Sequence, residues 1–377
     1  MKLSRETVSS AKRFRRFGAT LLAATLAATV GTAVTAPEAS AYRDFYTPPK
    51  SFSATPGDVI RTEKTPLLLQ IPGIDDQWPG NAKKMMYTST QQNGEPVAVT
   101  GYVVEPNAAW TGKGPRPTVV IGPGTVGQGD LCAGSKMLAL PLSIDPQKLS
   151  LGVNYAGLEM YLLLLNGVRV AVTDYVGMGT PGVHTYVNRL ESGRAMLDAA
   201  RAALDIAGVP ANSPVGFSGY SQGGGAAASA AELAESYAPE LNVKATYAGA
   251  PPADLNKVIP QIDGTFIAGA IGYAINGLAA RYPELGPILG KETNAYGKQV
   301  FGAVADQCIG DTGLRYGFNR TNQWTRDGKS LTAIVKRYPE VQQMVDDQRI
   351  GRLKPNAPVL LTTGFADDVI PTGQVHQ

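Results

Sequence analysis

The stretch that decides the fold is Gly219-Tyr220-Ser221-Gln222-Gly223. The residues before it, 214–217, form a short and largely apolar run, which predicts a buried strand. The residues after it, 224–234, are rich in alanine and predict a buried helix. A serine on a sharp strand-to-helix turn has its hydroxyl pushed outward, and small residues two positions to either side let the backbone make that turn. We interpret the stretch as a nucleophile elbow, which indicates acyl transfer through a serine ester.

The alternative to an elbow is a glycine-rich turn with an ordinary surface serine, in a chain that holds 43 glycines. That alternative explains neither the strand before Ser221 nor the helix after it. If Ser221 is the nucleophile, the backbone N–H of Gln222 is predicted to be one donor of an oxyanion hole. A single donor of this kind commonly lowers the barrier by roughly 3 kcal/mol.

Strand and helix signals alternate around the elbow. A hairpin is predicted by Asn93-Gly94, which lies between two alternating runs. The predicted strands are 84–91, 97–104, 118–121, 168–173, 215–219, 243–248 and 359–363, and the predicted helices before the elbow are 158–165 and 190–207. Apolar strands that alternate with helices predict an α/β fold with a mostly parallel sheet covered on both faces.

The alternation stops between Pro252 and about Pro355, where several helices and no convincing strand are predicted. About a hundred helical residues inserted between two strands of such a sheet are typical of a cap domain. A separate C-terminal helical domain is the alternative, but the strand at 359–363 returns the chain to the sheet. The predicted organisation is a core at 42–251, a helical cap at 252–355 and a return to the core at 356–377.

The first 41 residues have the pattern of a signal peptide. Residues 1–17 are basic, 18–36 are small and apolar, and Ala39-Ser40-Ala41 follows as a cleavage site. A transmembrane anchor is the alternative, and Arg15-Arg16 leaves a twin-arginine signal open although its surroundings match that pattern poorly. We expect a secreted chain that begins at Tyr42 and is soluble, since no second long apolar run occurs.

Composition excludes several classes of function. The net charge of +3 comes largely from the leader, so the mature chain is near neutral and nucleic-acid binding is not indicated. With two histidines, two cysteines and no CxxC pattern, we expect no metal site and no cofactor. In an exported chain, Cys132 and Cys308 suggest one disulfide, and two reduced core thiols are the alternative.

A second oxyanion donor is predicted in the glycine-rich loop that follows the strand 118–121. Gly122-Pro123-Gly124-Thr125-Val126-Gly127 lies where this fold needs another N–H, and Thr125 is the expected donor. Its hydroxyl is a candidate third hydrogen bond. A loop without a ligand is the alternative, whereas a phosphate loop is a poor one because no Lys-Ser/Thr pair follows the glycines.

The triad acid is expected at the end of a late strand, after the nucleophile in chain order. The strand 359–363 is followed by Gly364-Phe365-Ala366-Asp367-Asp368-Val369-Ile370-Pro371. Asp367 is the candidate acid and Asp368 its rival. A solvated Asp-Asp turn is the alternative without function.

Several motifs occur together from about residue 44 to the last residue. They are Phe45-Tyr46-Thr47-Pro48-Pro49, Gly124-Thr125 with Gly127, Asp130-Leu131-Cys132-Ala133, Thr173-Asp174-Tyr175, Gly177-Met178-Gly179-Thr180-Pro181-Gly182, the elbow, and residues 364–371. In this order they resemble the secretory lipase family, the family of the A-type lipase of Candida. Gly134, where a proline is usual, is a minor departure.

The resemblance implies an α/β-hydrolase core with an inserted helical cap, acting on carboxylic esters of lipids without a cofactor. It implies Ser221 as nucleophile, Asp367 as acid, Thr125 and Gln222 as oxyanion positions, and a core-to-cap disulfide between Cys132 and Cys308. The expected function is a secreted triacylglycerol lipase or carboxylesterase, with transient lipid-interface contact through the cap. An acyltransferase of the same fold and an inactive lipid-binding homologue are the alternatives.

The general base is the main departure from the family. Its histidine is expected some tens of residues beyond the acid, whereas this chain ends at Gln377, ten residues beyond Asp367. His376 is expected on a helix and His184 is expected to pack, so neither is favoured as the base. We therefore expect a C-terminally incomplete copy of the fold. The apolar segment 266–278 is expected to line an acyl channel or to pack in the core, with neither favoured.

Overall fold

The computed structural model describes residues 45–67, 79–137, 142–145, 150–153 and 156–375. The chain divides into two units, Met1–Phe45 and Tyr46–Gln377, and the sheet and the numbered helices belong to the second unit. The signal peptide expected at 1–41 and His376 lie outside the described residues. Within the described ranges, no helix is long and apolar enough to cross a membrane.

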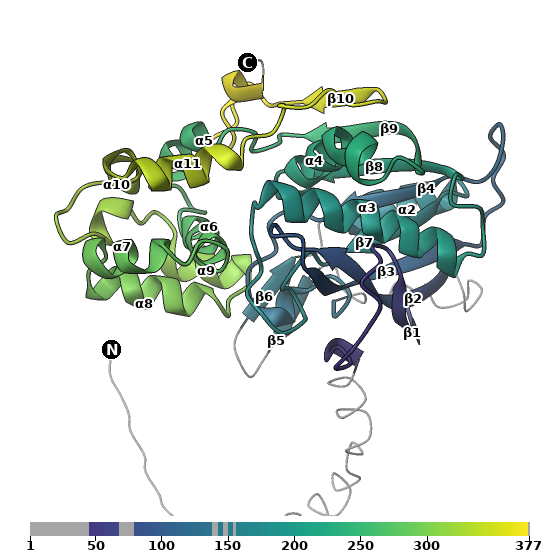
Figure 1. Ribbon diagram of the computed structural model, residues 1–377, viewed down its shortest axis with the longest axis horizontal. Coiled ribbons are helices and arrows are strands. Elements are labelled where there is room, and N and C mark those ends of the chain that lie inside the picture. The colour runs from purple at the N-terminus through teal and green to yellow at the C-terminus, as the bar shows by residue number, and fades with distance from the viewer. Residues whose placement is uncertain (1–44, 68–78, 138–141, 146–149, 154–155, 376–377) are drawn as a thin grey trace, which may run out of the picture. The chain divides into compact units, whose positions relative to one another are not determined.

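An eight-stranded sheet forms the centre of the fold (Figure 1), with the strand order β1-β2-β3-β7-β4-β8-β9-β10. The strands are β1 (Val59–Thr65), β2 (Gly80–Thr90), β3 (Pro96–Pro106), β4 (Thr118–Gly122), β7 (Arg169–Thr173), β8 (Pro214–Tyr220), β9 (Asn242–Gly249) and β10 (Val359–Thr362). The pairings from β1 to β7 are antiparallel, and those from β7 to β10 are parallel. The parallel half brings the C-terminal ends of β4, β8, β9 and β10 to one edge of the sheet, where the elbow and its partners follow their strands.

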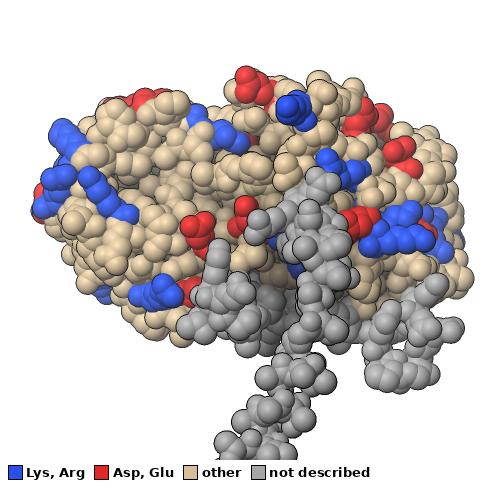
Figure 2. Space-filling model, turned by 90° about the horizontal axis from the view of Figure 1, so that it is seen from below, with Lys and Arg blue, Asp and Glu red and all other residues tan. Residues whose placement is uncertain are grey.

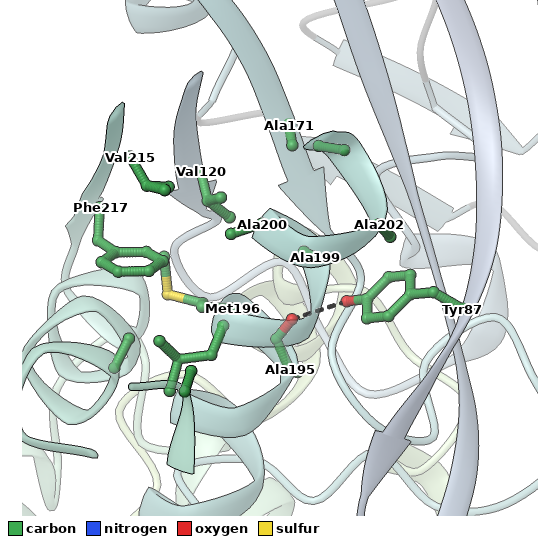
Figure 3. Close-up of a cluster of buried hydrophobic side chains, with 14 of the residues drawn as sticks. Tyr87, Val120, Ala171, Ala195, Met196, Ala199, Ala200, Ala202, Val215 and Phe217 are labelled. Carbon is green, nitrogen blue, oxygen red and sulfur yellow. Dashed lines mark hydrogen bonds between the residues drawn. The ribbon is translucent and has the colours of Figure 1, made fainter. Parts of the chain in front are cut away.

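Helices cover both faces of this sheet. Two helices, α3 (Arg189–Ile206) and α4 (Gln222–Tyr237), pack on the face that carries Val120, Ala171 and Phe217, as Figure 3 shows. The helix α2 (Gly157–Leu165) packs on the opposite face, against neighbours such as Ile121 and Val172. Successive strand residues point to opposite faces, so these short apolar strands must be covered on both sides.

Between β9 and β10 the chain forms an insertion of helices and contains no strand from 252 to 355, all of which is described. The helices are α5 (Leu255–Ile262), α6 (Ala270–Ala279), α7 (Leu285–Glu292), α8 (Ala295–Val304), α9 (Ile309–Tyr316), α10 (Leu331–Arg337) and α11 (Pro339–Asp347). They have a buried core of their own that includes Ile271, Tyr273 and Trp324. The domain boundaries expected at 251 and 355 stay a prediction.

Two features of the fold are absent from the sequence-based prediction. The strand β1 pairs with β2 at the antiparallel edge of the sheet, and a separate hairpin is formed by β5 (Leu142–Asp145) and β6 (Ser150–Val153). The predicted turn at Asn93-Gly94 is present: the Gly94 N–H donates to the Gln91 carbonyl at 3.0 Å and Gly94 has a φ of +92°. The helix after the elbow begins at Gln222 rather than at residue 224.

Candidate active site

The backbone at Ser221 is strained. Ser221 has φ 58° and ψ −121°, a combination that non-glycine residues rarely adopt and that marks functional sites. The strand β8 ends at Tyr220 and α4 begins at Gln222, so Ser221 alone makes the turn. Its N–H donates to the Gly249 carbonyl at 2.8 Å. Its side chain does not cap α4, so the hydroxyl is not taken up by the usual role of a serine at a helix start.

Glycines surround Ser221 because the backbone is too crowded for a side chain. A Cβ at Gly223 would lie 1.9 Å from the Gly122 carbonyl oxygen, and one at Gly219 would lie 2.2 Å from the Gly223 carbonyl oxygen. Atoms cannot approach so closely, so only glycine fits at both positions. The same crowding presses the loop after β4 against the first turn of α4.

The loop 122–127, which we call the proposed oxyanion loop, thus lies against the first turn of α4, directly after Ser221. Gly122 pairs with Gly219 in the sheet, and the Tyr175 hydroxyl donates to the Pro123 carbonyl at 2.9 Å. Thr125 is 9% exposed, and its Oγ1 lies 2.7 Å from the Tyr186 hydroxyl oxygen. Tyr186 was not predicted from the sequence as a neighbour of this loop.

The side chain of Gln222 is held by His184. Both residues are buried, and Gln222 Nε2 donates to His184 Nε2 at 3.0 Å. His184 Nδ1 in turn donates to the Val176 carbonyl at 3.1 Å. Burial lowers the pKa of His184 to about 4, so the ring is neutral at physiological pH. With both ring nitrogens engaged, His184 packs and orients Gln222 rather than serving as a base.

Asp367 lies in a turn near the elbow. Its Oδ1 accepts hydrogen bonds from the N–H groups of Val369 at 2.9 Å and Ile370 at 2.8 Å. Burial and, next, the charge of Asp367 raise the pKa of Tyr220, which directly precedes Ser221. Asp368, the rival, is exposed. The parallel pairing of β10 with β9 brings this turn to the edge where β8 ends.

The helical insertion is joined by a disulfide to the chain shortly after the proposed oxyanion loop. Cys132 and Cys308 form a disulfide, so the expected pairing is confirmed and the reduced-thiol alternative is wrong. The Ile309 N–H donates to the Val126 carbonyl at 2.9 Å, and Gly127 forms an isolated β-bridge with Cys308. These contacts join α9 directly to the residue that follows Thr125.

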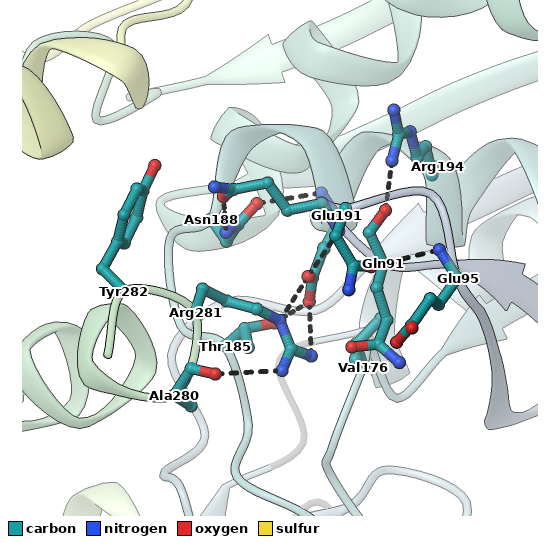
Figure 4. Close-up of polar contacts among 12 residues, drawn as sticks. Gln91, Glu95, Val176, Thr185, Asn188, Glu191, Arg194, Ala280, Arg281 and Tyr282 are labelled. Carbon is teal, nitrogen blue, oxygen red and sulfur yellow. Dashed lines mark hydrogen bonds and ion pairs between the residues drawn. The ribbon is translucent and has the colours of Figure 1, made fainter. Parts of the chain in front are cut away.

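An ion pair also links the insertion to the core (Figure 4). Arg281, which follows α6, donates to the Glu191 carboxylate, with Nη2 to Oε2 at 3.1 Å, and Glu191 lies in the first turn of α3. Glu191 is 1% exposed and also accepts from the Thr185 hydroxyl at 2.7 Å and the Gln92 N–H at 2.8 Å. Every lone-pair direction of this buried carboxylate thus has a donor.

The apolar segment 266–278 divides between two environments. Ala270, Ile271 and Tyr273 are buried in the core of the insertion. Ala274, Ile275 and Leu278 line an apolar cavity of about 70 Å³ between the helices, which Ile271 also lines. Core packing therefore accounts for part of the segment, and an acyl channel stays a prediction.

No group of three or more His, Cys, Asp or Glu residues that could hold a metal ion occurs among the described residues. Lys and Arg are mixed with Asp and Glu on the face shown in Figure 2. Mixed charges of this kind are typical of a solvated surface.

Comparison with known proteins identifies the family. The sequence profile of the secretory lipases matches residues 145–377. The chain belongs to the secretory lipase family. Lipase 5 of Candida albicans is 31% identical over 341 residues, which are 87% of this chain and 69% of that protein. The probable inactive lipase MT1628 of Mycobacterium tuberculosis is 27% identical over 353 residues, which are 88% of this chain and 72% of that protein.

A solved structure shows the same fold for this secretory lipase family member. The crystal structure of Candida antarctica lipase A in its closed state matches with a TM-score of 0.73 and 23% identity, over 88% of this chain and 75% of that chain. Together with the mostly parallel sheet and its helices, this similarity shows the expected α/β-hydrolase fold.

Proposed function

We propose that this secretory lipase family member is a secreted carboxylic ester hydrolase that acts on lipid esters through an acyl-enzyme on Ser221. The observation that carries the proposal is the strained backbone of Ser221 between β8 and α4. Strain of this kind persists at a nucleophile because it presents the hydroxyl to the substrate while the next backbone N–H faces the same point. Triacylglycerols are the proposed substrate class, in line with a relative named secreted triacylglycerol lipase LIP2 of Malassezia globosa.

In the proposed reaction, Ser221 Oγ attacks the ester carbonyl while its proton passes to a general base, and the base gives that proton to the alcohol as the alcohol leaves. The backbone N–H groups of Gln222 and Thr125 hold the oxyanion, and water then releases the fatty acid. Asp367 orients the histidine that serves as general base. His184 does not fill that role because both its ring nitrogens are engaged, and His376 lies outside the described residues.

An inactive lipid-binding homologue is the second candidate, and two observations favour it. One relative is named a probable inactive lipase, and no histidine with a free ring nitrogen occurs among the described residues. An acyltransferase uses the same nucleophile and oxyanion donors, so it differs only in which acceptor receives the acyl group.

A fluorophosphonate probe separates an active enzyme from an inactive homologue, because it reacts only with an activated serine. We expect labelling of the full chain and none of the Ser221→Ala variant, followed by hydrolysis of p-nitrophenyl butyrate and of emulsified tributyrin. Absence of Ser221-dependent labelling would assign the protein to the inactive class. If an added alcohol outcompetes water for the acyl group, the protein is a transferase.

A further inference from the structure

Two hydroxyl groups meet beside the proposed oxyanion hole, those of Thr125 and Tyr186, and no role was predicted for the second from the sequence. Thr125 Oγ1 and Tyr186 Oη lie 2.7 Å apart, the distance of a good hydrogen bond between hydroxyls. Thr125 is almost fully buried and Tyr186 is half-buried. The pair joins the loop after β4 to the loop between β7 and α3, which are 61 residues apart in the chain.

The ring of Tyr186 is fixed by neighbouring aromatic rings. It packs edge-on against Tyr273 of α6, with ring centres 5.6 Å apart and the planes at 74°. On another side it meets the ring of His184 at 6.1 Å and 73°. The Tyr186 N–H also donates to the His184 carbonyl at 2.8 Å. Because both ring and backbone are held, the Tyr186 hydroxyl is presented to Thr125 at a fixed point.

The chemistry of the two hydroxyls determines which one donates. A phenol is far more acidic than an aliphatic alcohol, so the Tyr186 O–H is the better donor and Thr125 Oγ1 the better acceptor. The proton of Thr125 is then left free for a second partner. Threonine is β-branched and stiff at χ1, so fixing its oxygen also fixes the direction in which its own O–H can point.

We infer that Tyr186 positions the Thr125 hydroxyl as a third donor of the oxyanion hole. The inference rests on the proposed function, because it assigns a partner to the charge that forms when Ser221 attacks an ester. Both hydroxyls keep their protons throughout: Tyr186 O–H donates to Thr125 Oγ1, and Thr125 O–H donates to the oxyanion. Tyr186 is thus a positioning residue, and Thr125 is the group that contacts the reacting oxygen.

A donor aimed at the oxyanion acts in the transition state and hardly in the ground state. Removing it therefore lowers kcat and leaves KM unchanged. Removing this donor should also weaken the binding of an alkyl trifluoromethyl ketone, because the adduct of that inhibitor with the serine carries the same oxyanion. Loss of a hydrogen bond that only stabilises the fold would change the melting temperature, but it would not lower kcat and inhibitor affinity together at an unchanged KM.

The test uses four single variants and one double variant of the full chain, with p-nitrophenyl butyrate as substrate. For Thr125→Val we expect a loss in kcat of about 10²-fold, the effect of one oxyanion donor, and Thr125→Ser should restore most of it. For Tyr186→Phe we expect about a tenfold loss, since the Thr125 hydroxyl remains but is no longer oriented. Tyr273→Phe is the matched control, because its hydroxyl donates to Thr312 at 2.6 Å and not to the proposed oxyanion loop.

The combined Thr125→Val, Tyr186→Phe variant decides the result. If Tyr186 acts through Thr125, this variant is no slower than Thr125→Val alone, and the inhibition constant of the trifluoromethyl ketone rises in step with the loss in kcat. Additive losses, or a Tyr186→Phe variant with unchanged kcat, would overturn the inference while Ser221-dependent labelling leaves the proposed function intact. Absence of that labelling in the unsubstituted protein would overturn both.

Discussion

The disulfide between Cys132 and Cys308 is predicted to supply a large part of the stability of the fold. The two residues are separated by 176 positions, so the bond closes a loop of nearly half the chain. The chain-entropy relation for a loop of that length gives about 5 kcal/mol of stabilisation at 25 °C, by restricting the unfolded state. Domains are commonly stable by only about 5–15 kcal/mol, so the loss of this bond should be plain to measure.

The folded state of a Cys132→Ala, Cys308→Ala variant should change little. The Ile309 N–H still donates to the Val126 carbonyl at 2.9 Å, and the Gln128 N–H still donates to the Gln307 carbonyl at 3.0 Å. Both positions are buried, and alanine is an apolar residue close in size to cysteine. The cost should therefore fall on the unfolded state, which becomes freer to expand.

Guanidinium denaturation followed by circular dichroism measures the effect. We expect the variant to unfold at a clearly lower denaturant concentration than the oxidised protein, with a somewhat larger m-value because its unfolded chain exposes more surface. Dithiothreitol should lower the stability of the unsubstituted protein to that of the variant and should leave the variant unchanged. A difference below about 1 kcal/mol would refute the reasoning from loop closure.

Three further changes test other parts of the structure. Gly223→Ala should cost more than about 3 kcal/mol or abolish soluble expression, because the new Cβ meets the carbonyl oxygen of the loop after β4 at 1.9 Å; thermal unfolding checks this. Glu191→Gln should lower the free energy of unfolding by about 3 kcal/mol, since it leaves the Arg281 guanidinium without its buried counter-charge. The double variant Glu191→Gln, Arg281→Met should recover part of that loss, because it removes the unpaired charge. Burial lowers the pKa of His184 from 6.5 to about 4, so between pH 7 and pH 4 the imidazole takes up a proton in the unfolded state before it does so in the folded state. The free energy of unfolding, measured in urea and compared with that of His184→Gln, should therefore fall by about 3 kcal/mol over that range. A difference between the two proteins that does not change with pH would contradict the lowered pKa of His184.

The parts of the fold that the sequence predicted are those specified by local chemistry. The strand β8 and the helix α4 follow from an apolar run, small residues at the turn and an alanine-rich segment, each of which acts over a few neighbouring residues. The strand β1 was missed because its sequence, Val59–Thr65, is mostly polar and its residues are half-buried or exposed at the edge of the sheet. An edge strand depends on pairing with its neighbour more than on an apolar pattern of its own.

An apolar run predicts a strand but not its burial. Val359–Thr362 was expected as a strand and is one, yet Leu360 is 61% exposed and Leu361 is 47% exposed. A run of aliphatic residues is typical of a strand covered on both faces. Whether such a strand is covered depends on which elements pack against it, and the order of residues in the strand does not contain that information.

Candidate site residues within local motifs could be predicted from the sequence, whereas contacts between distant segments could not. Ser221 and Asp367 were proposed from motifs in which the neighbours along the chain create the required turn. The contact of Tyr186 with Thr125 and that of His184 with Gln222 join segments 61 and 38 residues apart, so they exist only after the chain has folded. The one local signal at Tyr186 is its place shortly after Asp174-Tyr175, and that motif does not say where a side chain will point.

The proposed oxyanion loop, residues 122–127, depends on the helical insertion as much as on the sheet. Towards the core, it is held by the close approach of Gly223 to Gly122. Towards the insertion, its Val126 carbonyl accepts from the Ile309 N–H, the disulfide of Cys308 holds the chain shortly after it, and Tyr273 packs against the Tyr186 ring. A displacement of α6 or α9 would therefore move the proposed oxyanion donors even where no substrate contacts those helices. Substitutions in the insertion that shift these helices should consequently lower kcat as well as alter substrate binding, because the helices of the insertion also hold the proposed oxyanion donors in position.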